Sequence, residues 1–504
     1  MTTVIIPTVG VGSRMNPFTT DLNKALLPYK GKPILAHIIN QFPVDTQFLI
    51  PIGHFGEQIV DFCNLAFADH NIVFVPIDDW SSEKSGPGYT LKKCASIVNE
   101  SFWYVPCDTY FDEPITFKDS DCYFVRQVDK SLSSLYTTFK IDENSKILDI
   151  MFKVAATEHC VAFTGLMYIH DHEEFFNRLI LSNSNEIVYA FRKHSDVAFL
   201  YSWLDFGNPD IYRETFNSSQ KFDFAKKDEI TYICNNRVVK WWKNDSIAPI
   251  KLAKYMVSPA VYPKCCEQSH NWLAYDLFPG KTMYAHDDSN TFPKLLDWLN
   301  SNLWLPRSGD IRAESFAFYR DKTLLRIQQF KKKYPNLPKI DCIDGIQISE
   351  TLIDKIDWNY LATTVTPTVM HGDLQFDNII INPAGEFVLI DWRPDFSGLI
   401  FLGDKYYDLA KLYGGLVIDY SKIKDGQFDM SISGTEVSLK IPSITNQLIY
   451  QNDLIQYAIS NGHDVNKIEL LVPIIFLNMA PLHEQPFDQI LWYMGLKLLH
   501  ENLY

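Results

Sequence analysis

The sequence predicts an α/β protein with two domains, the first of them built on a doubly wound, mostly parallel sheet. Over the first 125 residues, short apolar runs alternate with amphipathic stretches, which is the pattern of strands joined by crossover helices. A chain of 504 residues also exceeds what one hydrophobic core usually organises. From Thr291 the pattern becomes helical, apart from a strand-rich island at Val365–Asp391.

The expected strands of the first domain are short apolar runs, several of which end in proline. Helices are expected between them at Pro33–Gln41 and Gly56–Asn64. Ligands of such sheets bind beyond the carboxyl ends of the strands, so residues that follow a strand are the first candidates for a site. The strands are expected at Val4–Pro7, Gln47–Pro51, Ile72–Pro76, Phe102–Pro106 and Cys122–Arg126.

A polar segment, NSSQKFDFAKKD at 217–228, interrupts the apolar pattern and is predicted to link two domains. The domains would then span 1–216 and 229–504. After the linker, Ile230–Ile233 and Arg237–Trp242 predict a strand pair, because two consecutive asparagines between them form a common turn dipeptide.

The composition limits the classes of partner. The formal net charge is −15 and no block of Lys or Arg stands out, so nucleic acid and anionic membranes are not expected partners. The N-terminal segment lacks the basic stretch and apolar core of a signal peptide, and no run approaches the ~20 apolar residues of a membrane span. The nine cysteines form no CxxC pair. We therefore expect a cytoplasmic protein without membrane insertion, and homo-oligomerisation is left open.

The first predicted strand is followed by GVGSRMNPFT, NKALLP and GKPIL. Gly10 and Gly12 let the backbone approach a triphosphate and, with Ser13, present N–H groups to it. Arg14 and Lys24 supply fixed positive charge to the same phosphates.

This run resembles the opening of the sugar-phosphate nucleotidylyltransferase family, whose members carry a GxGxRxxPxT loop, a PKxLxP segment and a KPxL helix start. The segments PCDTYF, TGLMY and SWLDFGNPDIY follow in the order that the family shows, so the resemblance covers roughly 1–216. It implies a Rossmann-like fold of the GT-A type. It also implies that Asp108 and Asp205 bind Mg²⁺, that Arg14 contacts the pyrophosphate, and that Lys24 contacts the phosphates at the reacting centre.

The resemblance also suggests substrate-binding residues and shows two departures. Gly165 lies in the family's AGxY-like strand, and Gly86 and Gly88 lie where the family recognises the base. Hexose-1-phosphate enzymes carry Glu-Lys-Pro where this chain has Phe-Lys-Val around Lys153. Lys153 can still bind the substrate phosphate, but the carboxylate that holds sugar hydroxyls is missing.

The most specific pattern is HGDLQFDN at 371–378 followed by IDWR at 390–393. It resembles the aminoglycoside phosphotransferase and choline kinase families, which implies a bilobal, protein-kinase-like α+β domain. The resemblance assigns Asp373 to the substrate hydroxyl and Asn378 and Asp391 to Mg²⁺ on ATP. His371 is interpreted as a brace for the loop.

The first lobe of this kinase-like domain has a weaker signature. Lys240 is the candidate for contact with the ATP phosphates, the alternative being a solvated strand lysine. No glutamate is clearly placed in the next expected helix, which offers Lys251 and Lys254 instead. The segment Tyr275–Thr282 resembles an interlobe linker.

Together these patterns predict a bifunctional, Mg²⁺-dependent enzyme. The second domain would phosphorylate a sugar, polyol or amino alcohol with ATP. The first would transfer a nucleotidyl group from an NTP, with CTP or UTP favoured, to the phosphorylated product. One alternative is a nucleotidylyltransferase whose kinase-like domain only binds or regulates, and another is a nucleotide sensor without catalysis.

Overall fold

The computed structural model describes residues 2–82, 85–116, 119–155, 160–218, 228–286, 288–349, 351–442 and 444–504. It divides into two compact units. The N-terminal unit takes Met1–Ser219 with Thr231–Val239, and the C-terminal unit takes Gln220–Ile230 with Lys240–Tyr504. Most of the expected linker at 217–228 falls on residues outside the described ranges, so that boundary stays a prediction.

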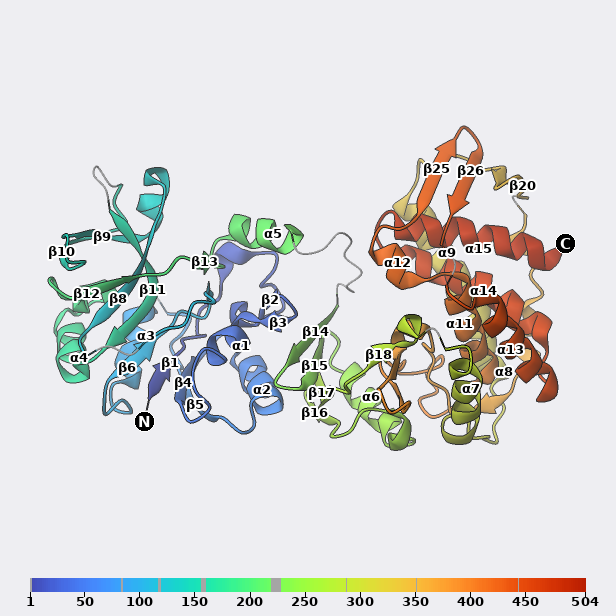
Figure 1. The fold of residues 1–504 in the computed structure, drawn as a ribbon, viewed down its shortest axis with the longest axis horizontal. Helices are drawn as coiled ribbons and strands as arrows, with labels where there is room; N and C mark the ends of the chain where they lie inside the picture. The colour runs from blue at the N-terminus through green and yellow to red at the C-terminus, as the bar shows by residue number, and fades with distance from the viewer. Residues whose placement is uncertain are drawn as a thin grey trace. The chain divides into compact units, whose positions relative to one another are not determined.

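The N-terminal unit is built on a nine-stranded sheet, and the predicted α/β fold is confirmed (Figure 1). The strand order is β10-β9-β11-β6-β1-β4-β5, with β8 pairing with β11 and β12 pairing with β8. Parallel pairing joins β6, β1, β4 and β5, whereas β11, β9 and β10 pair antiparallel, so the sheet is mixed. The strands are β1 (Thr3–Ile5), β4 (Gln47–Ile52), β5 (Asn71–Pro76), β6 (Phe102–Tyr104), β8 (Cys122–Gln127), β9 (Thr137–Ile141), β10 (Ile147–Phe152), β11 (Val161–Ile169) and β12 (Asp196–Phe199).

Helices cover the sheet according to the alternation of its side chains. Ile5 and Leu49 belong to one buried cluster, to which α3 (Pro87–Cys94) and α4 (His172–Leu181) also contribute. The side chains between them point the other way; the Phe48 ring, for example, packs on Phe42, which follows α1 (Ile34–Ile39). Helix α2 (Gly56–Ala66) packs on β4 and β5. The period of two along each strand therefore fixes which residues meet which helix.

Two close backbone approaches position the end of β6, where the first candidate site lies. The short strands β7 (Thr109–Tyr110) and β13 (Leu204–Asp205) pair antiparallel, so that Asp205 lies opposite Thr109. Gly165 in β11 has φ +92°, and a Cβ there would stand 2.3 Å from Pro106 Cγ. Only glycine allows β11 to pass this close to the segment that precedes Asp108.

A four-stranded sheet with the order β14-β15-β17-β16 forms the first lobe of the kinase-like domain, although Thr231–Val239 of its first two strands is grouped with the N-terminal unit. The predicted strand pair is confirmed, because β14 (Glu229–Cys234) and β15 (Arg237–Trp242) are joined by two asparagines that both have positive φ. The other strands are β16 (Glu267–Ser269) and β17 (Trp272–Asp276), and the helix of this lobe is α6 (Ile247–Tyr255).

The second lobe contains the strand-rich island and most of the helices. Strand β18 (Lys281–Thr282) pairs with β22 (Ile379–Ile381), which pairs with β23 (Phe387–Leu389). The HGDLQFDN segment at 371–378 directly precedes β22. The segment between β17 and β18 therefore joins the two lobes. The helices are α7 (Thr291–Asn302), α8 (Arg312–Phe316), α9 (Lys322–Lys333), α10 (Trp358–Thr363), α11 (Lys405–Val417), α12 (Tyr420–Lys424), α13 (Gln447–Ser460), α14 (Val465–Met479) and α15 (Phe487–Leu503).

A further sheet was not expected from the helical pattern. It has the order β20-β19-β26-β25, and its hairpin of β25 (Asp429–Ser433) and β26 (Glu436–Lys440) is visible near the red helices (Figure 1). The signal was present as alternation of apolar and polar residues on both sides of a glycine turn. The other strands, β19 (Cys342–Ile343) and β20 (Ile346–Gln347), are too short to show a period.

Among the described residues, one helical stretch, Val465–Leu482, has the length and apolar composition of a membrane span. Its mean hydropathy is 1.4, and 67% of it is buried inside the protein. Its helix α14 packs against α15, α11 and α9, which is the environment of a core helix.

Gly165→Ala should destabilise the N-terminal unit, because the new Cβ meets Pro106 in addition to the cost of positive φ. Gly31→Ala is the matched control, since Gly31 has φ +75° but nothing within 4 Å of a Cβ. We expect Gly31→Ala to lower the unfolding free energy by about 1–2 kcal/mol. Gly165→Ala should lower it by about 1–3 kcal/mol more. Denaturant unfolding of both variants measures the difference, and equal losses would show that the close approach is unimportant.

Candidate active sites

The loop after β1 is held by Asn23, a buried residue that the motif analysis did not single out. Its Nδ2 donates to Thr8 O at 2.9 Å and to His54 O at 2.7 Å, and its Oδ1 accepts from Ala25 N at 3.0 Å. Gly12 has φ +69° and its carbonyl accepts from the Thr19 hydroxyl at 3.0 Å. The rest of the predicted phosphate-binding set on this loop is exposed: Gly10, Ser13 and Arg14.

Lys24 and Asp108 form an ion pair at the end of β6. Lys24 Nζ lies 2.9 Å from Asp108 Oδ2, and the side chains are 21% and 15% exposed. Burial disfavours the charged form of each side chain, but the opposite charge of its partner outweighs this effect. The pKa of Asp108 is therefore held below its ordinary value and that of Lys24 above it. The carboxylate stays ionised and available to a cation.

Asp205 lies close to Asp108 across Gly207. A Cβ on Gly207 would stand 2.8 Å from Asp108 Oδ2 and 3.0 Å from Asp205 Oδ1. The Gly207 N–H donates to Asp205 Oδ1 at 2.9 Å. Burial and then the charge of Asp108 raise the pKa of Asp205, as expected for two carboxylates that share one small volume. The structure thus brings together the two predicted metal ligands.

Tyr136 is a member of this site that sequence reasoning missed. Its hydroxyl donates to Asp205 Oδ2 at 3.1 Å, and its carbonyl accepts from the Lys153 N–H at 3.2 Å. Lys153 has φ +50° and an exposed side chain, so it lies at the rim of the site. No motif includes Tyr136, which stands in an unremarkable segment before β9.

The two glycines of the predicted base-recognition loop have a structural role in packing. A Cβ on Gly86 would lie 2.6 Å from Asn185 O, and one on Gly88 would lie 2.9 Å from the same atom. The Gly88 N–H donates to Asn185 O at 2.7 Å. Close approach of two backbones explains both glycines, and their contact with a base stays a prediction.

In the C-terminal unit, side chains of the HGDLQFDN segment (371–378) form hydrogen bonds with backbone atoms of the same segment. Asn378 Nδ2 donates to Asp373 O at 2.8 Å, which leaves its Oδ1 as the ligand atom for a cation. The Asp373 N–H donates to His371 Nδ1 at 3.2 Å, so the Nε2–H of His371 donates to Ile390 O at 2.9 Å. His371 is fully buried, and burial lowers its pKa to about 3. It is a neutral brace at any physiological pH.

Asp408 in α11 binds the backbone at the start of the HGDLQFDN segment. Its carboxylate accepts from the N–H groups of His371 and Gly372 at 2.8 and 2.7 Å and from Trp304 Nε1 at 3.1 Å. The carboxyl is completely buried, and three donors satisfy it. Asp373 itself forms an ion pair with Lys411 of the same helix at 2.8 Å.

Lys240 is buried and lies beside Asp391, so the alternative of a solvated strand lysine is wrong. Lys240 Nζ contacts Asp391 Oδ1 and lies 3.2 Å from Glu229 Oε1. Burial opposes the charge of Asp391, but Lys240 keeps its pKa below the ordinary value. The missing glutamate partner therefore comes from the adjacent strand β14 rather than from the helix that follows.

Helix α6 contributes two buried lysines in place of that glutamate. Lys251 Nζ donates to Trp392 O, and Lys254 Nζ donates to Arg393 O at 2.8 Å and to His371 O at 3.3 Å. Burial lowers the pKa of Lys254 to about 7. The two lysines thus hold the backbone that follows Asp391, and Lys254 also holds the carbonyl of His371.

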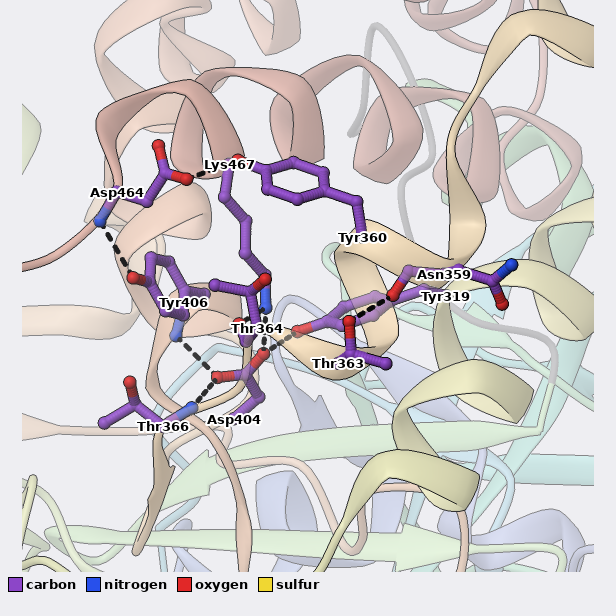
Figure 2. A network of polar contacts seen from close by, with 10 residues as sticks. All are labelled: Tyr319, Asn359, Tyr360, Thr363, Thr364, Thr366, Asp404, Tyr406, Asp464 and Lys467. Atoms are coloured by element: carbon purple, nitrogen blue, oxygen red, sulfur yellow. Dashed lines mark hydrogen bonds and ion pairs between the residues drawn. The ribbon is translucent and has the colours of Figure 1, made fainter.

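A second buried carboxylate, Asp404, connects separate segments of the second lobe (Figure 2). It lies 2.8 Å from Lys467 Nζ and accepts from the Tyr319 hydroxyl at 2.8 Å and from Thr366 N at 2.9 Å. Both partners of the ion pair are fully buried. The network fixes the start of α11, and with it Asp408 and Lys411.

The donor sets in both units suit Mg²⁺. Each set offers hard oxygen ligands from two side chains and leaves the other positions to water and phosphate, as that ion prefers. Within the described ranges no cluster of three or more His, Cys, Asp or Glu side chains forms a complete protein cage for a metal. Neither site therefore has the ligand set of a structural zinc.

Parts of the chain are similar to known proteins. Residues 251–430 match the model of the phosphotransferase enzyme family, so this part of the chain is a domain of that family. The chain is 32% identical over 114 residues to a bifunctional protein GlmU of Methanocaldococcus jannaschii, and 27% identical over 113 residues to one of Methanococcus maripaludis. These segments are 22% of this chain, which spans about a quarter (26%) of the relatives' length.

Two solved structures are similar to the N-terminal half. A UDP-glucose pyrophosphorylase in complex with UDP-glucose is 16% identical, with a TM-score of 0.38 over 44% of this chain and 98% of its own. The CTP:phosphocholine cytidylyltransferase of Streptococcus pneumoniae is 15% identical, with a TM-score of 0.35 over 42% and 96%.

His371 predicts a specific pH dependence. With a pKa of about 3 in the folded protein and ~6.5 in the unfolded chain, the unfolded chain binds more protons between these values. Stability should therefore fall as the pH drops below ~6.5, by about 1.4 kcal/mol per pH unit from this group.

His371→Asn should remove that contribution, so its unfolding free energy should depend less on pH between 5 and 6.5 than that of the wild type. Chemical denaturation of the C-terminal unit at several pH values measures this slope. The exposed His270 gives the control, His270→Asn, which should keep the wild-type slope. Parallel curves for all three proteins would show that His371 is not buried as a neutral ring.

Proposed function

We propose that the chain is a bifunctional transferase with two active sites. The C-terminal unit phosphorylates a small hydroxyl compound with ATP, and the N-terminal unit transfers a nucleotidyl group from an NTP to the phosphorylated product. The products are an NDP-activated precursor and pyrophosphate, with CTP or UTP as the favoured NTP. The observation that carries the proposal is that each unit pairs a lysine with a candidate metal-binding aspartate, Lys24 with Asp108 and Lys240 with Asp391.

In the N-terminal unit, a phosphate oxygen of the acceptor attacks the α-phosphorus of the NTP. Asp108 and Asp205 would hold Mg²⁺, and Lys24, beside Asp108, would contact the reacting phosphates. Arg14 is exposed on the loop and would meet the leaving pyrophosphate. Lys153 would bind the phosphate of the acceptor. Fixed charges of this kind stabilise the transition state without reorganisation.

In the C-terminal unit, Asp373 would accept the proton of the acceptor hydroxyl as it attacks the γ-phosphorus of ATP. Lys240 would contact the ATP phosphates, and Asn378 and Asp391 would hold Mg²⁺. In both sites, bound Mg²⁺ supplies positive charge to the phosphate oxygens. Phosphoryl transfer depends mainly on positioning and charge, which the buried loop supports.

The order of the two reactions follows from their chemistry, because the product of the kinase is the phosphomonoester that the nucleotidylyltransferase consumes. Activated precursors of this kind supply cell-surface polysaccharide or lipid decoration. The alternative, a nucleotidylyltransferase with a regulatory kinase-like unit, is less favoured because the buried Lys240 is held between Asp391 and Glu229.

Asp108→Asn should abolish pyrophosphate release while leaving ATP-dependent phosphorylation intact, and Asp391→Asn should do the converse. Each removes one preorganised charge, which costs at least ~100-fold in turnover. Pyrophosphate release and ADP formation are measured on the same preparations, and mass spectrometry identifies the NDP product. If either substitution lowered both activities equally, the assignment of one reaction to each unit would be wrong.

Asp373→Asn separates catalysis from binding in the C-terminal unit. The amide keeps the shape but cannot take the proton, so turnover should fall at least ~100-fold. Mg·ATP affinity, measured by calorimetry, should stay within about threefold, which is below ~1 kcal/mol. An unchanged rate would mean that the loop is a scaffold without catalysis.

A further inference from the structure

The helix that runs beside the kinase-like catalytic loop is interrupted by a π-helical turn. Between α8 and α9, the turn η7 spans Ala317–Asp321. Such turns are rare and frequently mark functional sites. Tyr319 anchors it, because its hydroxyl donates to Asp404 at the start of α11 (Figure 2). The position of the neighbouring residues Phe318 and Lys322 is therefore fixed relative to α11.

The Phe318 ring contacts two basic side chains, Lys322 and Arg393, which with Arg326 we call the cationic cluster. Lys322 Nζ lies 3.9 Å from the centre of the Phe318 ring, and Arg393 Cζ lies 5.0 Å from the same centre. The ring packs edge-on against Tyr407, 4.9 Å away, and Lys322 Nζ lies 6.0 Å from the Tyr407 ring. Two cations thus share one aromatic surface that belongs to two different helices.

This cluster adjoins the catalytic aspartate. The Arg393 side chain packs against the Gly372 backbone, since a Cβ there would lie 2.7 Å from Arg393 Cβ, and Lys411 is in an ion pair with Asp373. Burial lowers the pKa of Lys322 well below its ordinary value, and Arg393, Lys411 and Arg326 lower it further, whereas Asp373 raises it. Lys411 is thus paired with Asp373, and two further basic side chains, Lys322 and Arg393, lie next to its loop.

The cluster lacks the anions that would balance it. Within the described part of the chain, the Lys322 ammonium has neither a hydrogen-bond acceptor nor a carboxylate partner, and Arg326 donates only to the neutral Gln329 at 2.9 Å. Like charges that are held together inside a protein repel one another. A group of basic side chains without anionic partners therefore indicates that a ligand supplies negative charge.

The nucleotide side of the site is governed by other charges. The ionisation of Asp391 depends chiefly on Lys240, Lys251 and Glu229, which come from the first lobe. Lys322 and Arg326 come from α9 in the second lobe. Arg393 shares the Phe318 ring with Lys322 and packs against Gly372, the residue before Asp373. The cationic cluster therefore lies where it can meet the acceptor that Asp373 serves.

We propose that the acceptor of the C-terminal unit is an anionic alcohol, a small hydroxyl compound that also carries a carboxylate or phosphate group bound by Lys322, Arg326 and Arg393. The inference rests on the proposed kinase function and narrows its substrate class. The acceptor oxygen forms a bond to the γ-phosphorus, the bond from that phosphorus to the bridging oxygen of ADP breaks, and the hydroxyl proton passes to Asp373. Amino alcohols and other cationic acceptors are excluded, because the cluster repels them.

The first test compares acceptors that share a skeleton and differ in charge. Full-length protein with Mg·ATP is assayed with glycerol, 3-amino-1,2-propanediol, glycerate and glycerol 3-phosphate, and with glucose, glucosamine, glucuronate and glucose 6-phosphate. We expect kcat/KM to be at least tenfold higher for an anionic member than for its neutral counterpart, and the carboxylate and phosphate arms identify the group. A preference for a neutral or amino compound would overturn the inference but leave the kinase function standing. Absence of phosphorylation with every acceptor, while ATP still binds, would reject the kinase function itself.

The second test locates the anion-binding group. Lys322→Met should raise the KM for the preferred anionic acceptor at least tenfold and leave the KM for ATP within twofold. Lys331→Met, an exposed position on the same helix, is the matched control and should change neither. Arg326→Gln provides a second variant if Lys322→Met does not fold. The inference would be wrong if Lys322→Met raised the KM for ATP, and did so by the same factor whether the acceptor was neutral or anionic. That result would show that the cluster binds the transferred phosphate instead.

Discussion

An ion pair between a lysine and the aspartate assigned to metal binding is the interaction on which both candidate sites depend. Lys24 meets Asp108 in the N-terminal unit, and Lys240 meets Asp391 in the C-terminal unit. A carboxylate that leaves water without a partner takes up a proton instead, so it could neither bind a cation nor organise its surroundings. Removing one partner of a buried pair typically costs 3–5 kcal/mol, because the other charge is left uncompensated. Two unrelated folds have thus met one electrostatic requirement in the same way.

The second shared feature is that backbone atoms, rather than side chains, determine where the reacting groups lie. Asp408 holds the N–H groups of His371 and Gly372, and Lys254 holds the carbonyl groups of His371 and Arg393. In the N-terminal unit, Gly165 and Gly207 let the backbone pass where any side chain would collide with the site. Fully satisfied buried polar networks of this kind are rigid, and rigidity is what catalysis by fixed charges needs.

The two sites differ in how they balance charge. In the N-terminal unit, two carboxylates face one lysine, and burial with mutual repulsion raises the pKa of Asp205. Around Asp373 the balance is reversed, since Lys411 pairs with this carboxylate and Lys322 and Arg393 lie beside its loop. The first arrangement suits a metal ion, and the second suits an anion. Local charge balance therefore says more about the ligands than the net charge of −15, which describes the surface as a whole.

The sequence by itself determined many of the elements and the contiguous motifs, but not the sheet β20-β19-β26-β25. The strands that end at Tyr104 and Leu389, the asparagine turn of the first hairpin, and the spacing from His371 to Asn378 are all local, so period and turn chemistry suffice to predict them. Only the tertiary structure decided which distant residues complete each site. Glu229, Tyr136, Lys411 and Lys322 belong to no motif, and they reach their partners through strand pairing and helix packing across long stretches of chain. A pattern along the chain records which face of an element is buried, but it does not record what that face meets, because the contact depends on both partners at once.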